Sequence, residues 1–502
     1  MIATREAATG ANRRTDRFCQ SARLSLALLV ALGIAVGARA QSAPADAERE
    51  SARAALRAAA ASYKPIADRI IAAALAQDEA YAKLEQLCDD VGHRLSGSPG
   101  LERAIEWALA TMKADGHENV RAQPVMAPKW VRGRESLRML SPTERPLPML
   151  GLGGSVGTPP EGITAAVVSV SGLEELDALG DKVAGKIVLF DVPMSEENAA
   201  EGGGYGTAVR YRGAGARYAV KHGAVAVLVR SVTTRSLQSP HTGAMSYLDA
   251  IKRIPAAAIS VEDAAKITRL QRRGIEVRVK LQMEARTEPD APSANVLAEL
   301  RGREKPEEIV VIGGHLDSWD VGQGAHDDGG GCVMAMQALT VLRKLDLRPR
   351  RTIRVVLFTN EENGLAGGRA YASEFANELP RHVAAVEADA GTFAFRGYSI
   401  DLENDELETH AAATLTAIHD LLAVIEPAPQ IRRGWSGADI GPMRPAGVPL
   451  LGQRVDMTHY FDYHHTHADT FDKVAKADLD ENVAAMAVLA YVLADMPGTL
   501  RE

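Results

Sequence analysis

The segment "EIVVIGGHLDSWDVGQGAHDDGGGCVMAMQALTVLRKL" (308–345) joins an apolar run, a polar glycine-rich turn and a second apolar run. The first run, 308–315, is short and rich in β-branched residues, which predicts a strand. The last run, 331–345, is long enough for a helix. Residues 313–331, which span the turn and the adjoining ends of both runs, hold six ionisable side chains and seven glycines. Acidic groups this close repel one another unless a cation or solvent relieves them, so the turn is a candidate site.

The same strand–helix rhythm continues toward the C-terminus. Two more strands and two more helices are expected, at 352–360, 382–391, 364–379 and 405–425. This alternation predicts an α/β fold, a mostly parallel or mixed sheet with helices on both faces. Glu361 and Glu362 follow one expected strand, and Asp389 lies where the apolar run of another ends. Because ligand sites of open α/β sheets lie at the carboxyl ends of strands, these acids should meet the turn at one edge.

Residues 129–290 have a different texture, with short apolar runs separated by glycine and proline. They are expected to form a small inserted β-rich domain with one helix near 207–222. The domain prediction is therefore a catalytic domain in two parts, 41–128 and 291–502, interrupted by the insert. The alanine-rich stretch from 42 to about 80 favours helix.

The N-terminus is typical of an export signal. Several arginines precede a fourteen-residue apolar run, 24–37, and "ARA" (38–40) supplies a small-x-small cleavage site. The prediction is a signal peptide over 1–40 and a secreted or periplasmic mature protein. An uncleaved membrane anchor is the alternative, although the run is short for a membrane span.

Composition limits the classes of function. The 502 residues are 46% hydrophobic and 24% charged, which is ordinary for a globular enzyme, and they exceed one usual domain. The net charge of −8 argues against a nucleic-acid partner, because phosphate binding needs a basic face. Cys19 lies in the signal, and Cys88 and Cys332 make no disulfide framework; whether they pair stays open.

The candidate site residues also have simpler interpretations. Glu361 and Glu362 could be an acidic first turn of a helix, which the helix dipole favours. "YHHTHADT" (463–470) could be a solvated loop, although three imidazoles in four positions are unusual without a metal. Taken together, however, histidines and carboxylates at one sheet edge form a mixed N and O donor set of the kind that catalytic zinc uses.

Four motifs, in order along the chain, resemble those of the co-catalytic zinc exopeptidase family, most closely its carboxypeptidase Q type. They are "GGHLDSWDVGQGAHDDGGG" (313–331), "FTNEENGLAGGRAYA" (358–372), "EADAGTF" (387–393) and "FDYHHTHADT" (461–470). Within the insert, "VAGKIVLF" (183–190) and "IPAAAIS" (254–260) are similar to the protease-associated domain of several relatives.

The resemblance implies two zinc ions and assigns each site residue. The implied metal ligands are His315 and Asp389 on one ion, Glu362 and His465 on the other, and Asp327 between them, with a water held between the ions. Asp317 is implied to orient His315, and Glu361 to be the general base. Asp328 follows Asp327 across a strained peptide bond that can be cis.

The family's spacing places the last ligand four residues before the acid of the closing "DT" pair. Counting back from Asp469 gives His465. His464 then occupies a position where some relatives carry a tyrosine that contacts the reacting carbonyl, so it is a candidate oxyanion contact and is grouped with Glu361 as catalytic. His467 is expected to be a neighbour, with replacement of His465 as the alternative.

Substrate contacts are expected in "GWSGADIGPM" (434–443), at Ser436, Gly437 and Asp439. The alternative is that Ser436 or Asp439 caps a helix. Arg432 and Arg433 could anchor a carboxylate or be solvated. Trp319 could stack over the site or pack in the core.

The function expected from the sequence is an exported dinuclear zinc exopeptidase of the carboxypeptidase Q type, homodimeric, acting on small peptides or dipeptides. No nucleic-acid partner is expected, and no membrane association after signal removal. An aminopeptidase on the same scaffold is the alternative. A receptor-like relative without activity would have lost metal ligands, whereas all five positions and the base are intact.

Overall fold

The computed structural model describes residues 49–249, 252–428 and 430–501. The predicted signal peptide, 1–40, lies outside this part of the chain. Residues 56–501 form one compact unit, and the description below concerns this unit. Among the described residues, no helix has both the length and the apolar character that crossing a bilayer requires.

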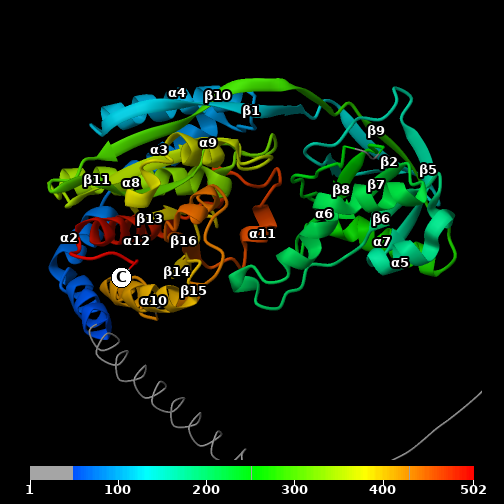
Figure 1. Cartoon of the computed structure of the whole chain (residues 1–502). Coiled ribbons are helices and arrows are strands. Elements are labelled where there is room, and N and C mark those ends of the chain that lie inside the picture. Colours follow the sequence, from blue (N-terminus) through cyan, green and yellow to red (C-terminus); the bar gives the residue numbers. More distant parts are fainter. Residues whose placement is uncertain (1–48, 250–251, 429, 502) are drawn as a thin grey trace, which may run out of the picture. The chain divides into compact units, whose positions relative to one another are not determined.

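The first sheet has eight strands in the order β1–β10–β12–β11–β13–β16–β14–β15 (Figure 1). In that order the strands are Glu118–Val131, Arg286–Leu300, Arg351–Phe358, Lys305–His315, His382–Glu387, Leu450–Val455, Phe395–Asp401 and Gln430–Arg433. The central run β12–β11–β13–β16 is parallel, whereas β10 and β14 join it antiparallel. The predicted mixed α/β sheet is therefore confirmed.

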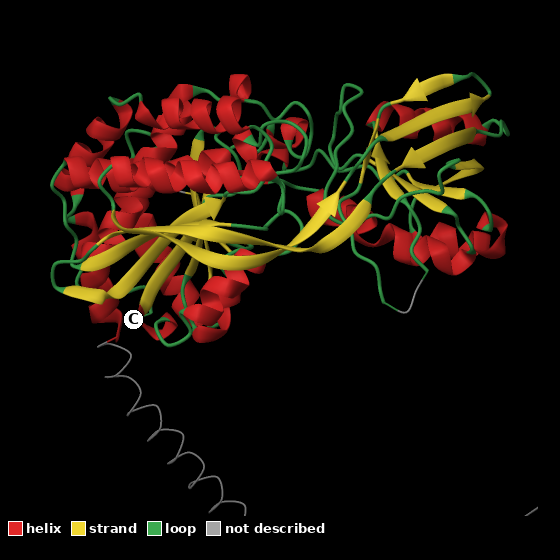
Figure 2. Cartoon of the chain, turned by 90° about the horizontal axis from the view of Figure 1, so that it is seen from above, coloured by secondary structure: helices red, strands yellow, loops and turns green. Residues whose placement is uncertain are grey.

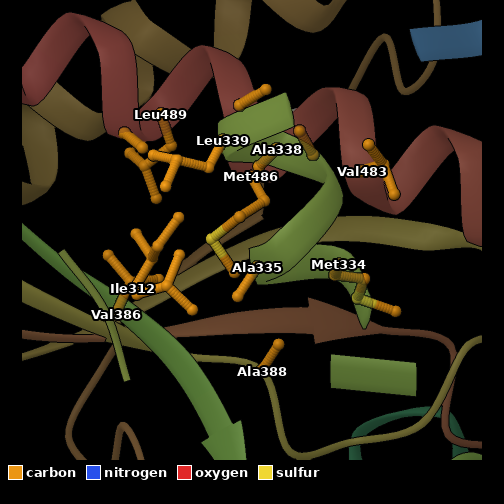
Figure 3. Packing of buried hydrophobic residues seen from close by; sticks show 14 of the residues in the cluster. Ile312, Met334, Ala335, Ala338, Leu339, Val386, Ala388, Val483, Met486 and Leu489 are labelled. Carbon is orange, nitrogen blue, oxygen red and sulfur yellow. The ribbon is translucent and has the colours of Figure 1, made fainter. Parts of the chain in front are cut away.

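Helices cover both faces of this sheet. They are α2 (Lys64–Leu75), α3 (Glu79–Gln86), α4 (Pro99–Ala114), α8 (Gly330–Lys344), α9 (Ala366–Glu374), α10 (Asp405–His419) and α12 (Lys476–Asp495), whereas the single turn α11 (Tyr460–Tyr463) packs on residues of the second-sheet region. Successive residues of a strand point to opposite faces. Val310 and Ile312 of β11 accordingly join the core with α8 and α12, whereas Ile309 and Val311 join a second core with α9. Figure 3 shows Ile312 and neighbouring apolar residues packed between strands and helices.

A second sheet lies within the stretch expected to be inserted. Its order is β3–β2–β9–β5–β6–β7–β8–β4, formed by Arg145–Leu147, Glu135–Ser141, Arg278–Met283, Ile163–Val170, Ile187–Phe190, Ala226–Arg230, Ala256–Ile259 and Met149–Gly151. Three helices accompany it, α5 (Leu173–Leu179), α6 (Tyr205–Ala219) and α7 (Val261–Arg272). The expectation of one helix was therefore wrong, because α5 has only seven residues and more than half of the residues of α7 are polar.

Two long strands join the sheets. β1 and β10 pair antiparallel along their length, and each continues within a few residues into a strand of the second sheet. Figure 2 shows them as extended yellow ribbons between the two sheets. Neither strand was predicted from the sequence, because both contain prolines, which interrupt a strand pattern. β1 is an edge strand, where proline is tolerated. Cys88 and Cys332 are buried free thiols.

Candidate metal centre

The candidate site lies where three parallel strands end. β11 ends at His315, which pairs with Phe358, the last residue of β12. β13 ends at Glu387, two residues before Asp389. The cis peptide bond between Asp327 and Asp328 lies in the turn before α8, where the resemblance implied a strained link. The strand ends thus bring the acids and histidines of distant segments together, as the alternation of strands and helices predicted.

One group of side chains surrounds His315. Its Nε2 lies 3.2 Å from Oδ1 of Asp327 and 3.5 Å from Oδ1 of Asp389. His315 is buried, and its Nδ1 donates to the backbone carbonyl of Asp317 at 3.0 Å. That contact leaves Nε2 facing the two carboxylates, where it can ligate a cation once it has lost its proton.

A second group surrounds His465, on the other oxygen of Asp327. His465 Nε2 lies 3.1 Å from Oδ2 of Asp327 and 3.1 Å from Oε2 of Glu362. The backbone N–H of Trp319 donates to the other Glu362 oxygen at 3.1 Å, which fixes that carboxylate. The Asp327 carboxylate therefore stands between the two groups, with one oxygen toward each.

The donor atoms of both groups fit metal ions. Bonds of about 2.0–2.1 Å to a tetrahedral zinc ion separate neighbouring ligand atoms by roughly 3.3 Å. The four separations given above run from 3.1 to 3.5 Å. His315 Nε2 and Asp327 Oδ2 are buried, and neither has a hydrogen-bond partner in the described part of the chain. Buried polar atoms are normally satisfied, so these two atoms are suited to ligate cations.

Asp317 and Asp328 hold the surrounding backbone. The carboxylate of Asp317 accepts the backbone N–H of Glu361 at 3.0 Å and that of Glu362 at 3.3 Å. It therefore orients the two glutamates, while His315 is oriented by the Asp317 carbonyl rather than by its carboxylate, which lies 3.9 Å away. Asp328 accepts the backbone N–H groups of His315 and Gly331, each at 3.0 Å, and so ties the strand end to α8.

Asp469 has a role that sequence reasoning missed. Its two carboxylate oxygens accept the backbone N–H groups of His326 at 2.8 Å and Asp327 at 3.2 Å. Burial raises the pKa of Asp469 to about 7. In the sequence, the "DT" pair was used only to count back to His465. In the structure, its aspartate holds the backbone of Asp327, the residue that lies between the two donor groups.

Glu361 lies beside both groups without belonging to either. It is partly exposed, and neither of the two groups of close donor atoms includes it. Burial raises the pKa of Glu361 to about 8; the charge of His315 opposes this effect and the carboxylates of Asp389, Asp317 and Asp327 add to it. A carboxylate that is costly to ionise and next to a reactive centre is suited to accepting a proton.

The three histidines of the "HHTH" motif occupy different places. His464 stacks on His465 with ring centroids 3.5 Å apart, and its Nε2 lies 3.7 Å from Asp327 Oδ2. His467 is exposed and lies in neither group. The geometry therefore favours His465 over His467 as a ligand, and it leaves His464 close enough to contact a substrate held there.

The loop 434–443 lies against Glu387, the last residue of β13. Ser436 is buried, and Gly437 lies so close to Glu387 that an added Cβ would be 2.3 Å from its Oε2. Asp439 is buried, and both of its carboxylate oxygens lack partners among the described residues. Burial and the charge of Glu387 raise the pKa of Asp439 well above its ordinary value. The capping alternative was wrong, because the next helical turn, Gly441–Ala446, begins after Ile440.

Three further side chains have specific partners. Arg432 pairs with Glu201 and Arg433 with Glu408, so each guanidinium already has a carboxylate partner within the chain. Trp319 is buried against Gly153, as expected for packing, and its ring is also 5.5 Å from that of His465.

Side chains and backbone of the second-sheet region also reach the site. Thr242 donates its backbone N–H to the carbonyl of His465 at 3.0 Å, and its own carbonyl accepts from His465 Nδ1 at 3.3 Å. Arg212 of α6 places Nη1 3.4 Å from the same ring nitrogen. These residues precede the metal motifs by more than 70 positions and carry no local signal, so sequence reasoning did not find them.

Known proteins resemble this chain in sequence and fold. The family described as Peptidase family M28 matches residues 295–490. Carboxypeptidase Q of Bos taurus is 41% identical over 84% of this chain and 86% of its own length. The carboxypeptidase Q of Homo sapiens is 40% identical over 84% and 86%. A crystal structure of a peptidase M28 precursor from Shewanella amazonensis SB2B has a TM-score of 0.82 at 36% identity, over 88% of this chain and 98% of that one.

Proposed function

Because this chain belongs to peptidase family M28 and is of its carboxypeptidase Q type, we propose that it is a dinuclear zinc exopeptidase that hydrolyses the terminal peptide bond of small peptides or dipeptides. The observation that carries the proposal is the pair of donor groups that share Asp327, with atoms 3.1 to 3.5 Å apart.

The proposed ligands form two sets that share one residue. His315 and Asp389 would hold one zinc ion, Glu362 and His465 the other, and Asp327 would contact both. When bound, two such ions lower the pKa of water between them and stabilise negative charge on the attacked carbonyl oxygen.

Glu361 is the proposed general base. Asp317 holds its backbone beside the donor groups, and its elevated pKa favours proton transfer near neutral pH. Glu361 takes a proton from water as the water oxygen attacks the peptide carbonyl carbon. It then delivers that proton to the leaving amine as the C–N bond breaks. His464, above His465, is the proposed donor to the developing oxyanion.

Further parts of the proposal concern the rest of the chain. Residues 129–290 are proposed to be an inserted protease-associated domain between catalytic parts 41–128 and 291–502, which the continuous second sheet supports. The sequence of 1–40 supports export by a cleavable signal, and resemblance to the carboxypeptidase Q type supports a homodimer. Ser436, Gly437 and Asp439 are retained as proposed neighbours of the substrate.

One experiment tests the reaction and identifies the recognised end of the substrate. The purified chain is incubated with unblocked, N-acylated and C-amidated versions of one dipeptide, with and without a chelator. A metal-dependent carboxypeptidase should cleave the N-acylated dipeptide but not the C-amidated one, and the chelator should abolish cleavage. The reverse tolerance would identify an aminopeptidase, and a requirement for both free ends a dipeptidase. Cleavage that survives complete metal removal would refute the proposal.

A further inference from the structure

Helix α6 of the second-sheet region begins beside the metal centre. Its first residue, Tyr205, stacks on Phe461 of α11 with ring centroids 5.0 Å apart and an interplanar angle of 23°. The edge of the same ring meets His464 at 5.6 Å and 83°. Figure 1 shows α6 and α11 next to each other. Contacts on two sides fix the ring, so the phenol oxygen has a defined position close to the histidine pair.

The Tyr205 hydroxyl oxygen already accepts one hydrogen bond, whereas its proton can still be donated. Arg212 Nη2 donates to the Tyr205 oxygen at 2.9 Å. No described residue accepts the Tyr205 hydroxyl proton, although a tyrosine can both donate and accept. The hydroxyl proton is therefore available to a substrate.

Arg212 is itself unusual, because its charge is buried without an acid. It is 7% exposed, and its partners among the described residues are the Thr242 carbonyl, the His465 ring and the Tyr205 hydroxyl rather than a carboxylate. Its guanidinium packs on Gly243, where an added Cβ would lie 2.4 Å from Cζ. Hydrogen bonds from a charged donor are stronger than neutral ones and polarise the group that receives them. Arg212 thus makes the Tyr205 O–H a stronger donor.

The electrostatics of Tyr205 agree with this geometry. Burial raises the pKa of Tyr205; Arg212 opposes this effect, and the carboxylates of Asp327 and Glu361 add to it. The phenol therefore keeps its proton at neutral pH, and the charges that act on it include Arg212, the shared ligand Asp327 and the proposed base Glu361.

We infer that Tyr205 is a further catalytic residue, which donates its hydroxyl proton as a hydrogen bond to the carbonyl oxygen of the scissile peptide as that oxygen becomes negative. Arg212 is the positioning residue that holds the phenol and strengthens its donation. This inference rests on the proposed exopeptidase function, and it makes Tyr205 a second hydrogen-bond donor to the oxyanion beside His464. It also gives the second-sheet region a direct part in the reaction.

The test compares Tyr205→Phe with Tyr211→Phe, a matched control on the same helix whose ring packs on Phe190 at 5.3 Å instead. Loss of one oxyanion donor lowers kcat by about 10²- to 10³-fold. Tyr205→Phe should therefore lose turnover on a dipeptide by about this factor, with KM and zinc content unchanged. Its affinity for a phosphinic dipeptide analogue, measured by calorimetry, should fall as kcat falls. Tyr211→Phe should match the wild type.

A second variant separates catalysis from structure. Zinc content is matched first, because Arg212 Nη1 also lies 3.4 Å from the His465 ring. At equal zinc content, Arg212→Met should lower kcat less than Tyr205→Phe, and the double variant should be no slower than Tyr205→Phe alone, because both changes then act through the same hydroxyl. Arg212→Lys should restore part of the loss. Unchanged kcat in Tyr205→Phe, or a loss in proportion to lost zinc, would overturn the inference. A wild-type protein that cleaves no dipeptide would instead overturn the proposed function.

Discussion

Replacing His465 with alanine tests the assignment of the last metal ligand. Its Nε2 lies 3.1 Å from one oxygen each of Asp327 and Glu362, so the change removes one of three donors in that group. The matched control is His467→Ala, two residues away, whose side chain is exposed and outside both groups.

The expected size of the effect follows from zinc affinity. Replacing a residue that only hydrogen-bonds to a metal ligand typically lowers metal affinity 10- to 100-fold. Removing a ligand itself should therefore lower the affinity for the second zinc ion by about 100-fold or more. A 100-fold change corresponds to about 2.7 kcal/mol of zinc-dependent stabilisation at a fixed zinc concentration. His465→Ala should therefore retain one tightly bound zinc ion per chain, while His467→Ala retains two.

Zinc titration against a competing chelator measures both affinities, and urea unfolding with and without zinc measures the linked stability. Metal-free His465→Ala should unfold close to the metal-free wild type, which excludes a general folding defect. Equal zinc loss in the two variants, or a larger loss in His467→Ala, would refute the assignment.

Three other changes give separable outcomes. Glu361→Gln should keep both zinc ions and lose most turnover, measured by metal analysis and kcat together; loss of one zinc ion would mean that the roles of Glu361 and Glu362 are exchanged. Asp317→Asn should lower kcat and weaken zinc at Glu362, because its carboxylate holds the backbone of both glutamates, and zinc competition at the second site measures this. Burial lowers the pKa of His382 from its ordinary value of 6.5 to about 4 in the folded chain. As the pH falls below 6.5, the unfolded chain therefore takes up this proton before the folded chain does, and folding becomes less favourable. This group alone should lower the free energy of unfolding by up to about 3 kcal/mol between neutral pH and pH 4. Urea unfolding of the metal-free proteins should show a smaller decrease in His382→Gln than in the wild type, and an identical decrease would refute the lowered pKa.

The sequence was informative where local pattern and topology agree. The apolar run that ends at His315 predicted a strand, and the carboxyl ends of parallel strands share one edge, so the meeting of His315, Glu362 and Asp389 could be foreseen. The spacing found in the family separated His465 from His467, and the structure has His465 inside and His467 outside the donor groups.

Other features could not be read from the sequence because they depend on contacts between distant segments. Tyr205, Arg212 and Thr242 lie in the second-sheet region, and nothing near them marks a site until folding brings α6 and the Thr242 loop to His464 and His465. β1 was missed because Pro124 and Pro128 break its pattern, a break that an edge strand tolerates.

The central claim is that Asp327 stands between two divalent ions. Anomalous diffraction at the zinc edge from crystals of the zinc-loaded protein measures this directly. The account predicts two peaks about 3.5 Å apart, one toward each Asp327 oxygen, with His315 and Asp389 at one and Glu362 and His465 at the other. A single peak in a fully active crystal, or zinc held by other side chains, would contradict it.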